Sequence, residues 1–300
     1  MRIGFALPVS GSWATPRNVA ALARRAEELG YSSLWTFQRL LVPADSTLPP
    51  VYRSVLDPLV VLGYAAAVTE RVRLGTAIVN MPYLAPAVLA KQLATLDVLS
   101  DGRVDAGLGL GWAREEFQAV GADYARRGAR AEEYLHCLRA LWGPDPVEHA
   151  GAFYRVPRGS VRPKPVQRPG PPILLGATAE RAMRRIGRLA DGWISNSRAD
   201  LTALAGPIRQ VRAAAEAAGR DPAALRFVCR GVVRDAPRTR PLTGSLDEVR
   251  ADLPDLAAQG MTEVFVDLNF DPTIGHPDAD PVAAMRRAHE VLEALAPDRP

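Results

Sequence analysis

Leu174-Leu175-Gly176-Ala177-Thr178-Ala179 joins a short apolar strand to an amphipathic helical segment through a turn of small residues. The same alternation of strand and helix occurs eight times along the 300 residues. Eight such units predict an α/β protein with a closed parallel (β/α)8 barrel, formed by residues 1–300 as a single domain. A Gly-rich turn late in such a barrel is a common phosphate site, because a helix N-terminus presents unpaired N–H groups and a positive dipole end.

The expected strands are short, apolar and rich in β-branched residues, as in parallel sheets whose two faces are both covered. Two segments interrupt the alternation and are expected to be insertions: residues 38–57 after the second strand, and the Pro-rich residues 143–172 before the fifth, with a hairpin-like stretch at 153–156. The expected strands are Arg2–Leu7, Ser33–Phe37, Val72–Val79, Val104–Leu108, Ile173–Leu175, Trp193–Ser195, Arg226–Val233 and Glu263–Leu268.

Composition excludes several classes of protein. The chain has 48% hydrophobic residues and a net charge of +4, and no apolar run approaches the ~18 residues of a membrane span. The N-terminus reads as a strand and not as a signal peptide, so a cytoplasmic protein is expected. Arginines alternate with acidic residues on helical faces, which argues against nucleic-acid binding. The two cysteines, Cys137 and Cys229, lack metal-ligand spacing and are expected to be free thiols.

The positions of the reactive side chains exclude several barrel chemistries. A Schiff-base enzyme needs a lysine at a strand end, but Lys91 falls within a helical pattern and Lys164 within the Pro-rich insertion. The four histidines are scattered, so no metal site is expected. Asp267 follows a strand, yet no partner carboxylate for glycoside hydrolysis is evident. These absences also disfavour a lyase or isomerase acting on a phosphorylated substrate, and they favour chemistry performed by a bound cofactor.

Seven motifs then carry a resemblance along almost the whole chain. In their order and spacing the chain resembles the bacterial luciferase-like monooxygenase superfamily, and within it the oxidoreductases that use the deazaflavin coenzyme F-420. The motifs are LGYSSLWTF (residues 29–37), RLGTAIV (73–79), APAVLAKQLATLD (85–97), SDGR (100–103), GLGLGW (107–112), PPILLG (171–176) and LADGW (189–193).

The resemblance implies a flavin or deazaflavin lying across the barrel mouth. In relatives the third strand carries a non-proline cis peptide bond against the ring, and this maps to Ala77–Ile78. The cofactor phosphate would lie at Gly176, Ala177, Thr178 and Ala179, at the start of the following helix. One of the arginines that follow at positions 181, 184 and 185 could meet the anionic tail of a deazaflavin.

The chain departs from its F-420-dependent relatives at their proton-transfer residues. Many of them carry Asp-His after the second strand and Glu after the fourth, where this chain has Gln38-Arg39 and Trp112. Gln38, Arg39 and Trp112 are therefore the candidate catalytic residues. An arginine cannot act as a base, but Arg39 would suit a substrate oxygen that gains negative charge; a structural ion pair is the alternative.

Aromatic and acidic residues near the expected site have two readings each. Four aromatic residues are candidates for the wall of the substrate pocket, and ordinary burial in the core is the alternative for each: Trp13, Phe37, Tyr52 and Trp193. Trp112 is expected either to stack on a ligand or to pack in the core. Glu115 and Glu116 fall in the first turn of a helix, where stabilisation of the helix dipole accounts for them.

The expected activity is hydride transfer between C5 of F-420 and a small carbonyl, imine or activated alkene. The alternative is a reduced-FMN-dependent monooxygenase supplied by a separate reductase; a flavin- or deazaflavin-binding protein without turnover is a third reading. The expected partners are the small-molecule substrate, a flavin or F-420 reductase, and a second copy in a homodimer, as in relatives. No metal cofactor is expected.

Overall fold

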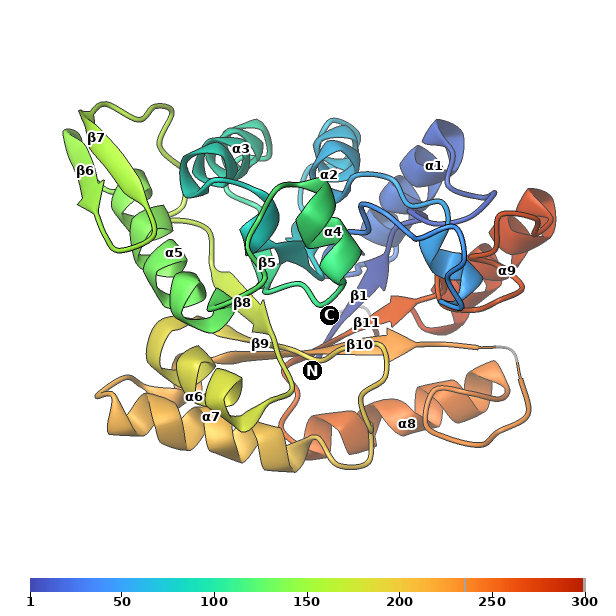
Figure 1. Cartoon of the computed structure of the whole chain (residues 1–300). Coiled ribbons are helices and arrows are strands. Elements are labelled where there is room, and N and C mark those ends of the chain that lie inside the picture. Colours follow the sequence, from blue (N-terminus) through green and yellow to red (C-terminus); the bar gives the residue numbers. More distant parts are fainter. Residues whose placement is uncertain (235, 299–300) are drawn as a thin grey trace.

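The computed structural model describes residues 1–234 and 236–298, and its centre is a closed parallel sheet surrounded by helices (Figure 1). The barrel strands are β1 (Arg2–Ala6), β2 (Ser33–Thr36), β3 (Arg73–Thr76), β4 (Val79–Asn80), β5 (Val104–Gly109), β8 (Ile173–Gly176), β9 (Gly192–Ile194), β10 (Arg226–Val232) and β11 (Glu263–Asp267). Neighbours run in the order β3-β2-β1-β11-β10-β9-β8-β5-β4, and a β3–β5 pairing closes the ring. The (β/α)8 barrel is therefore confirmed.

The third barrel strand is interrupted, which differs from the single strand Val72–Val79 expected from sequence. β3 ends at Thr76 and β4 resumes at Val79, and the Ala77–Ile78 peptide bond between them is cis, as the resemblance implied. A continuous run of buried apolar residues cannot reveal such a break. Together β3 and β4 occupy one position of the barrel, which leaves eight strand positions.

The helices cover the outside of the barrel, and several begin where the sequence predicts. α1, α2, α3 and α9 carry proline in the first turn, where its fixed φ and missing N–H cost nothing. Ser245 and Glu248 form the expected capping box of α8. The helices are α1 (Pro16–Glu28), α2 (Pro58–Ala66), α3 (Pro86–Leu99), α4 (Arg114–Ala119), α5 (Arg127–Trp142), α6 (Glu180–Leu189), α7 (Ala205–Ala217), α8 (Leu246–Ala258) and α9 (Pro281–Ala294).

The two insertions differ in structure. Residues 143–172 contain the antiparallel hairpin of β6 (Val147–Ala150) and β7 (Arg155–Gly159), which lies outside the barrel beyond α5 (Figure 1). Residues 38–57 run mostly without regular structure, apart from the short 3-10 helix Pro50–Tyr52. No helix in the described part of the chain is both long and apolar enough to cross a bilayer.

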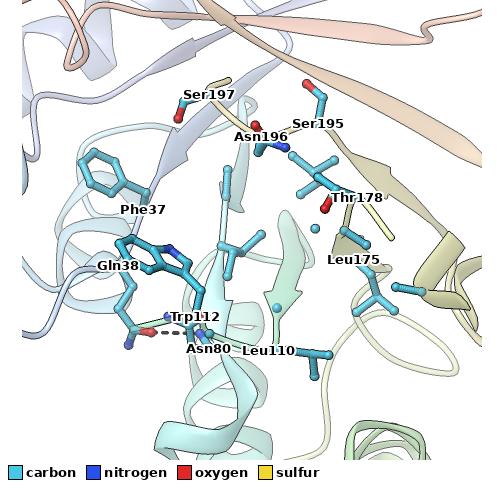
Figure 2. A pocket seen from close by; sticks show the side chains of 18 of the residues that line it. Phe37, Gln38, Asn80, Leu110, Trp112, Leu175, Thr178, Ser195, Asn196 and Ser197 are labelled. Carbon is cyan, nitrogen blue, oxygen red and sulfur yellow. Dashed lines mark hydrogen bonds between the residues drawn. The ribbon is translucent and has the colours of Figure 1, made fainter. Parts of the chain in front are cut away.

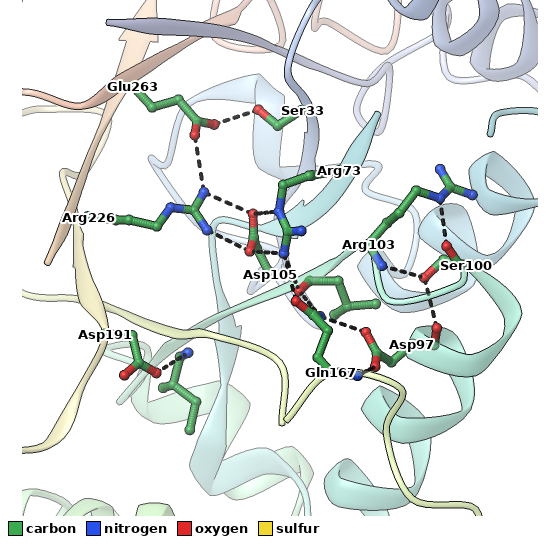
Figure 3. Close-up of polar contacts among 12 residues, drawn as sticks. Ser33, Arg73, Asp97, Ser100, Arg103, Asp105, Gln167, Asp191, Arg226 and Glu263 are labelled. Atoms are coloured by element: carbon green, nitrogen blue, oxygen red, sulfur yellow. Dashed lines mark hydrogen bonds and ion pairs between the residues drawn. The ribbon is translucent and has the colours of Figure 1, made fainter. Parts of the chain in front are cut away.

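An ion-pair network fills the barrel interior where the strands begin (Figure 3). The Asp105 carboxylate is fully buried and pairs with Arg73 at 2.6 Å and with Arg226 at 2.6 Å. Arg226 also pairs with Glu263 at 3.1 Å, and the Ser33 hydroxyl donates to the same carboxylate. These residues stand at or next to the first positions of β2, β3, β5, β10 and β11, the end of a barrel that contributes stability. The network holds these strands together from inside.

Both cysteines are free and buried, as expected. Burial raises the pKa of Cys137 to about 11 and the pKa of Cys229 to about 12. Because the thiolate is the reactive form, we expect neither thiol to react with an aromatic disulfide reagent at pH 8 in the native protein, and both to react at once in denaturant. Thiol counts in the two conditions test this; a native-state reaction that precedes unfolding would contradict it.

Candidate active site

A cavity of about 690 Å³ opens at the ends of the barrel strands, within the usual range for small-molecule sites. Figure 2 shows side chains from the β2 side, including Phe37, Gln38 and Trp112, facing Leu175, Thr178 and Ser195 across an open space. Most of the residues predicted from sequence line this cavity. They are Phe37, Gln38, Arg39, Tyr52, Ala77, Ile78, Trp112, Gly176, Ala177, Thr178 and Ala179.

One wall is formed by the turn between β8 and α6. α6 begins at Glu180, and its N-cap residue Ala179 has no side chain to pair with the first N–H groups of the helix. Those groups, together with the exposed Thr178 hydroxyl, face the cavity. Arg127 lines the same cavity, stacks on Tyr124 at 3.9 Å, and has no carboxylate at ion-pair distance among the described residues. The donors on this wall could pair with an anion.

The bulge at Ala77–Ile78 forms the adjoining part of the wall, and glycines make room for it. A Cβ atom at Gly109 would overlap the Ile78 side chain, and one at Gly176 would lie 3.2 Å from Ile78 Cγ2. The backbone at Asn80 is held by Gln38, whose Oε1 accepts from the Asn80 N–H at 2.8 Å (Figure 2). Gln38 therefore fixes the end of the bulge as well as lining the cavity.

Arg39 forms a buried ion pair that links two loops at the mouth. Its Nη1 lies 3.1 Å from Glu116 Oε2, with both side chains at most 5% exposed. Its guanidinium is sandwiched between the rings of Tyr52 at 4.5 Å and Trp112 at 4.6 Å. Arg39 Nε, by contrast, has no hydrogen-bond acceptor in the described structure. The ion-pair alternative thus holds for Arg39, and one of its donors stays unpaired.

The sequence accounted for Glu116 by stabilisation of the helix dipole, but the structure places it in a buried network. It is 2% exposed and accepts from the Leu40 N–H at 2.7 Å and from the Tyr83 hydroxyl at 2.8 Å. Burial, and then the hydrogen bond to Glu116, raise the pKa of Tyr83, so the phenol stays protonated and donates. First-turn position alone could not reveal this, because the insertion at 38–57 folds over α4 from far away in sequence.

Arg230 is a site residue that the sequence reading missed. It lies on β10, lines the cavity, donates from Nε to Asp267 Oδ2 at 2.7 Å and from Nη1 to the Ala77 carbonyl at 3.0 Å. The rings of Phe37 and Phe270 lie 4.8 and 4.4 Å from its guanidinium. Asp267, for which the sequence showed no partner carboxylate, is thus paired with a cation. An arginine within an otherwise apolar strand was the available signal, since such residues are almost never buried unpaired.

Two predicted wall residues lie elsewhere, and the prediction for them is wrong. Trp13 is fully buried in the core and Trp193 is 3% exposed; neither lines the cavity. The Trp193 Nε1 donates to the Ala177 carbonyl at 3.0 Å, so this ring supports the turn of the anion-binding wall from behind. Sequence pattern does not separate a ring that packs behind a site from one that lines it.

The charge on the cavity wall is one-sided. Five arginines line it, and no aspartate, glutamate, histidine, lysine or cysteine does among the described residues. No group of three or more potential metal ligands occurs in the described part of the chain. The wall can therefore bind anions and orient oxygen atoms, whereas electrons must come from a cofactor. The arginines are Arg39, Arg127, Arg185, Arg198 and Arg230.

Fold and site together define a (β/α)8 barrel protein with a cationic ligand cavity at the C-terminal ends of its strands. Residues 1–237 match the luciferase-like monooxygenase family. The chain belongs to this family and is an oxidoreductase.

The relatives and structural neighbours span both flavin and deazaflavin enzymes. An uncharacterised protein of Mycobacterium tuberculosis is 38% identical over 233 residues, 74% of this chain and 80% of that protein. An FMNH2-dependent dimethylsulfone monooxygenase of Pseudomonas putida is 33% identical over 51% of this chain and 42% of its own.

Two solved structures with lower identity support the fold. The monooxygenase RslO1 of Streptomyces bottropensis superposes with a TM-score of 0.80 at 23% identity, covering 98% of both chains. An F-420-dependent secondary alcohol dehydrogenase superposes with a TM-score of 0.77 at 18% identity, again over 98% of both chains.

Proposed function

We propose that the protein binds coenzyme F-420 and transfers a hydride between its C5 atom and a small organic substrate. The observation that carries this proposal is that five arginines and no carboxylate line the cavity among the described residues, and that two of them, Arg127 and Arg198, have no ion-pair partner there. The other three pair with carboxylates behind the wall. FMN carries a single phosphate, whereas F-420 adds an anionic tail to its phosphate, so the wall is better matched to the deazaflavin. The residues present fit such a group: a helix N-terminus for the phosphate, and apolar and glycine positions around Ile78 for the ring.

When bound, reduced F-420 would supply a hydride to an electrophilic carbon, and a solvent proton would complete the two-electron reduction. Arg39 would offer its unpaired Nε–H group to the substrate oxygen on which negative charge develops. Glu116, Tyr52 and Trp112 hold its guanidinium in place. Because no aspartate, glutamate, histidine, lysine or cysteine lines the wall among the described residues, we assign the proton to water.

A reduced-FMN-dependent monooxygenase is the second candidate, favoured by the sequence identity to the dimethylsulfone monooxygenase. Both cofactors would use the turn before α6, so the fold does not choose between them. Oxygen consumption driven by reduced FMN, absent with reduced F-420, would identify this second activity.

The discriminating experiment is a fluorescence titration of the purified protein with F-420 and FMN in both redox states. We expect F-420 to bind at least about tenfold more tightly than FMN, and Arg127→Met to weaken F-420 binding about tenfold by removing one charge-assisted contact. The matched control is Arg126→Met, since Arg126 is exposed, stacks on Phe153 and does not line the cavity. A preference for FMN in either redox state would overturn the F-420 proposal.

A further inference from the structure

A second, smaller cavity of about 290 Å³ lies beside the first. Its wall comes from the loops after β2, β9, β10 and β11. The two cavities are continuous, because four residues line both of them: Tyr52, Ser197, Arg198 and Phe270. A ligand in the main cavity can therefore extend into the smaller one.

The smaller cavity carries two cationic groups that no described carboxylate neutralises. Arg234 and Arg198 line it, and neither has a carboxylate at ion-pair distance among the described residues. Arg234 Nε is buried and has no hydrogen-bond partner among the described residues. Burial, and then the nearby charge of Arg234, lower the pKa of Arg240, a second cation of this loop. A buried donor without a partner is costly, and an anion supplied by a ligand removes that cost.

The carboxylate on this wall is already engaged. Asp271 is 2% exposed, and its Oδ1 accepts from the Thr273 N–H at 2.8 Å and from the Thr273 hydroxyl at 2.7 Å. It shapes the loop after β11 from within. With two arginines and one aspartate, the cavity keeps a net positive charge.

The position of the smaller cavity separates it from the cofactor phosphate. The anion-binding turn follows β8 and the bulge lies between β3 and β4, whereas the smaller cavity is framed by loops after β2, β9, β10 and β11. We propose that the smaller cavity binds a carboxylate of the substrate, so that the substrate is an organic acid whose reacting carbon lies in the main cavity. This assignment rests on the proposed function for the place of the ring.

The test uses F-420-loaded protein and ω-phenylalkanoates of three to six carbons, each compared with its neutral amide by calorimetric titration. We expect at least one acid to bind about tenfold more tightly than its amide. We expect Arg234→Met or Arg198→Met to remove this preference for the acid. Arg240→Met is the matched control, because Arg240 lies near Arg234 without lining either cavity. An acid preference that survives in both Arg234→Met and Arg198→Met, or none in the parent protein, would overturn the proposal.

A second arm distinguishes substrate from cofactor tail as the source of the carboxylate. F-420 is compared with the deazaflavin chromophore that lacks phosphate and tail. If Arg234→Met weakens F-420 alone and leaves the acid preference intact, the cavity holds the tail and the substrate assignment is wrong. Should the parent protein prefer FMN, the same acid and amide series on FMN-loaded protein still tests the carboxylate site, so the two proposals fail separately.

Discussion

Replacing Asp105 by asparagine is expected to lower the free energy of unfolding by about 3–5 kcal/mol, because removal of one partner leaves buried opposite charges uncompensated. Asp105 is fully buried and accepts from both Arg73 and Arg226. The measurement is the thermal or denaturant midpoint of the parent and the variant, with a fall in Tm on the order of 10 °C. The matched control is Asp123→Asn, which breaks an exposed pair with Arg130 and should cost less than about 1 kcal/mol.

The effect of Asp105 should depend on pH in a defined direction. Burial alone would raise the pKa of Asp105, but the hydrogen bonds and charges of Arg73 and Arg226 outweigh it and hold the pKa below its ordinary value. A carboxyl group with a depressed native pKa stabilises the fold above its unfolded pKa and loses that contribution as pH falls through the native value. The difference between parent and variant should stay constant from pH 5 to 8 and shrink below about pH 4. An equal difference at pH 3 and pH 7 would contradict this account.

Replacing Arg39 by methionine is expected to lower the rate of hydride transfer by about 10²–10³-fold, the usual cost of removing a donor to developing negative charge. Arg39→Lys should restore little of the rate, because a lysine has no Nε–H and cannot reproduce a planar group stacked between Tyr52 and Trp112. The rate is followed as the change in deazaflavin absorbance with whichever substrate a panel of organic acids and carbonyl compounds identifies.

Two controls separate this role from a structural one. The circular dichroism of Arg39→Met should match that of the parent, because Glu116 keeps its hydrogen bonds from Leu40, Leu41 and Tyr83. Its Tm should fall, because the buried Glu116 carboxylate loses its cation, so both rates are measured well below the Tm of the variant. F-420 affinity should also be preserved. If kcat is unchanged and only KM rises, Arg39 binds ground state and transition state equally and the proposed role is wrong.

The sequence predicted those parts of the site whose residues are contiguous in the chain, and missed contacts between residues far apart in the chain. The anion-binding turn at Gly176–Ala179 and the bulge at Ala77–Ile78 are contiguous motifs, and both line the cavity as predicted. The partner of Arg39 could not be predicted, because Glu116 lies 77 positions away and reads locally as the first turn of a helix. Trp13, in the loop after β1, and Trp193, within β9, show the converse. An aromatic residue near the site looks the same in the sequence whether it packs behind the site or lines it.

The sequence by itself determined the barrel, because eight apolar strands alternating with amphipathic helices can bury their faces only by closing a parallel sheet. Only the tertiary structure decided which charges oppose each other. Arg230 pairs with Asp267 because the adjacent strands β10 and β11 bring positions 230 and 267 together. Arg198 and Arg234 line one cavity because the loops after the neighbouring strands β9 and β10 converge at the rim. Pairing across strands depends on register and barrel closure, and local sequence encodes neither of them. The arginines at this rim came together only in the tertiary structure, and they are the residues that we propose bind the substrate.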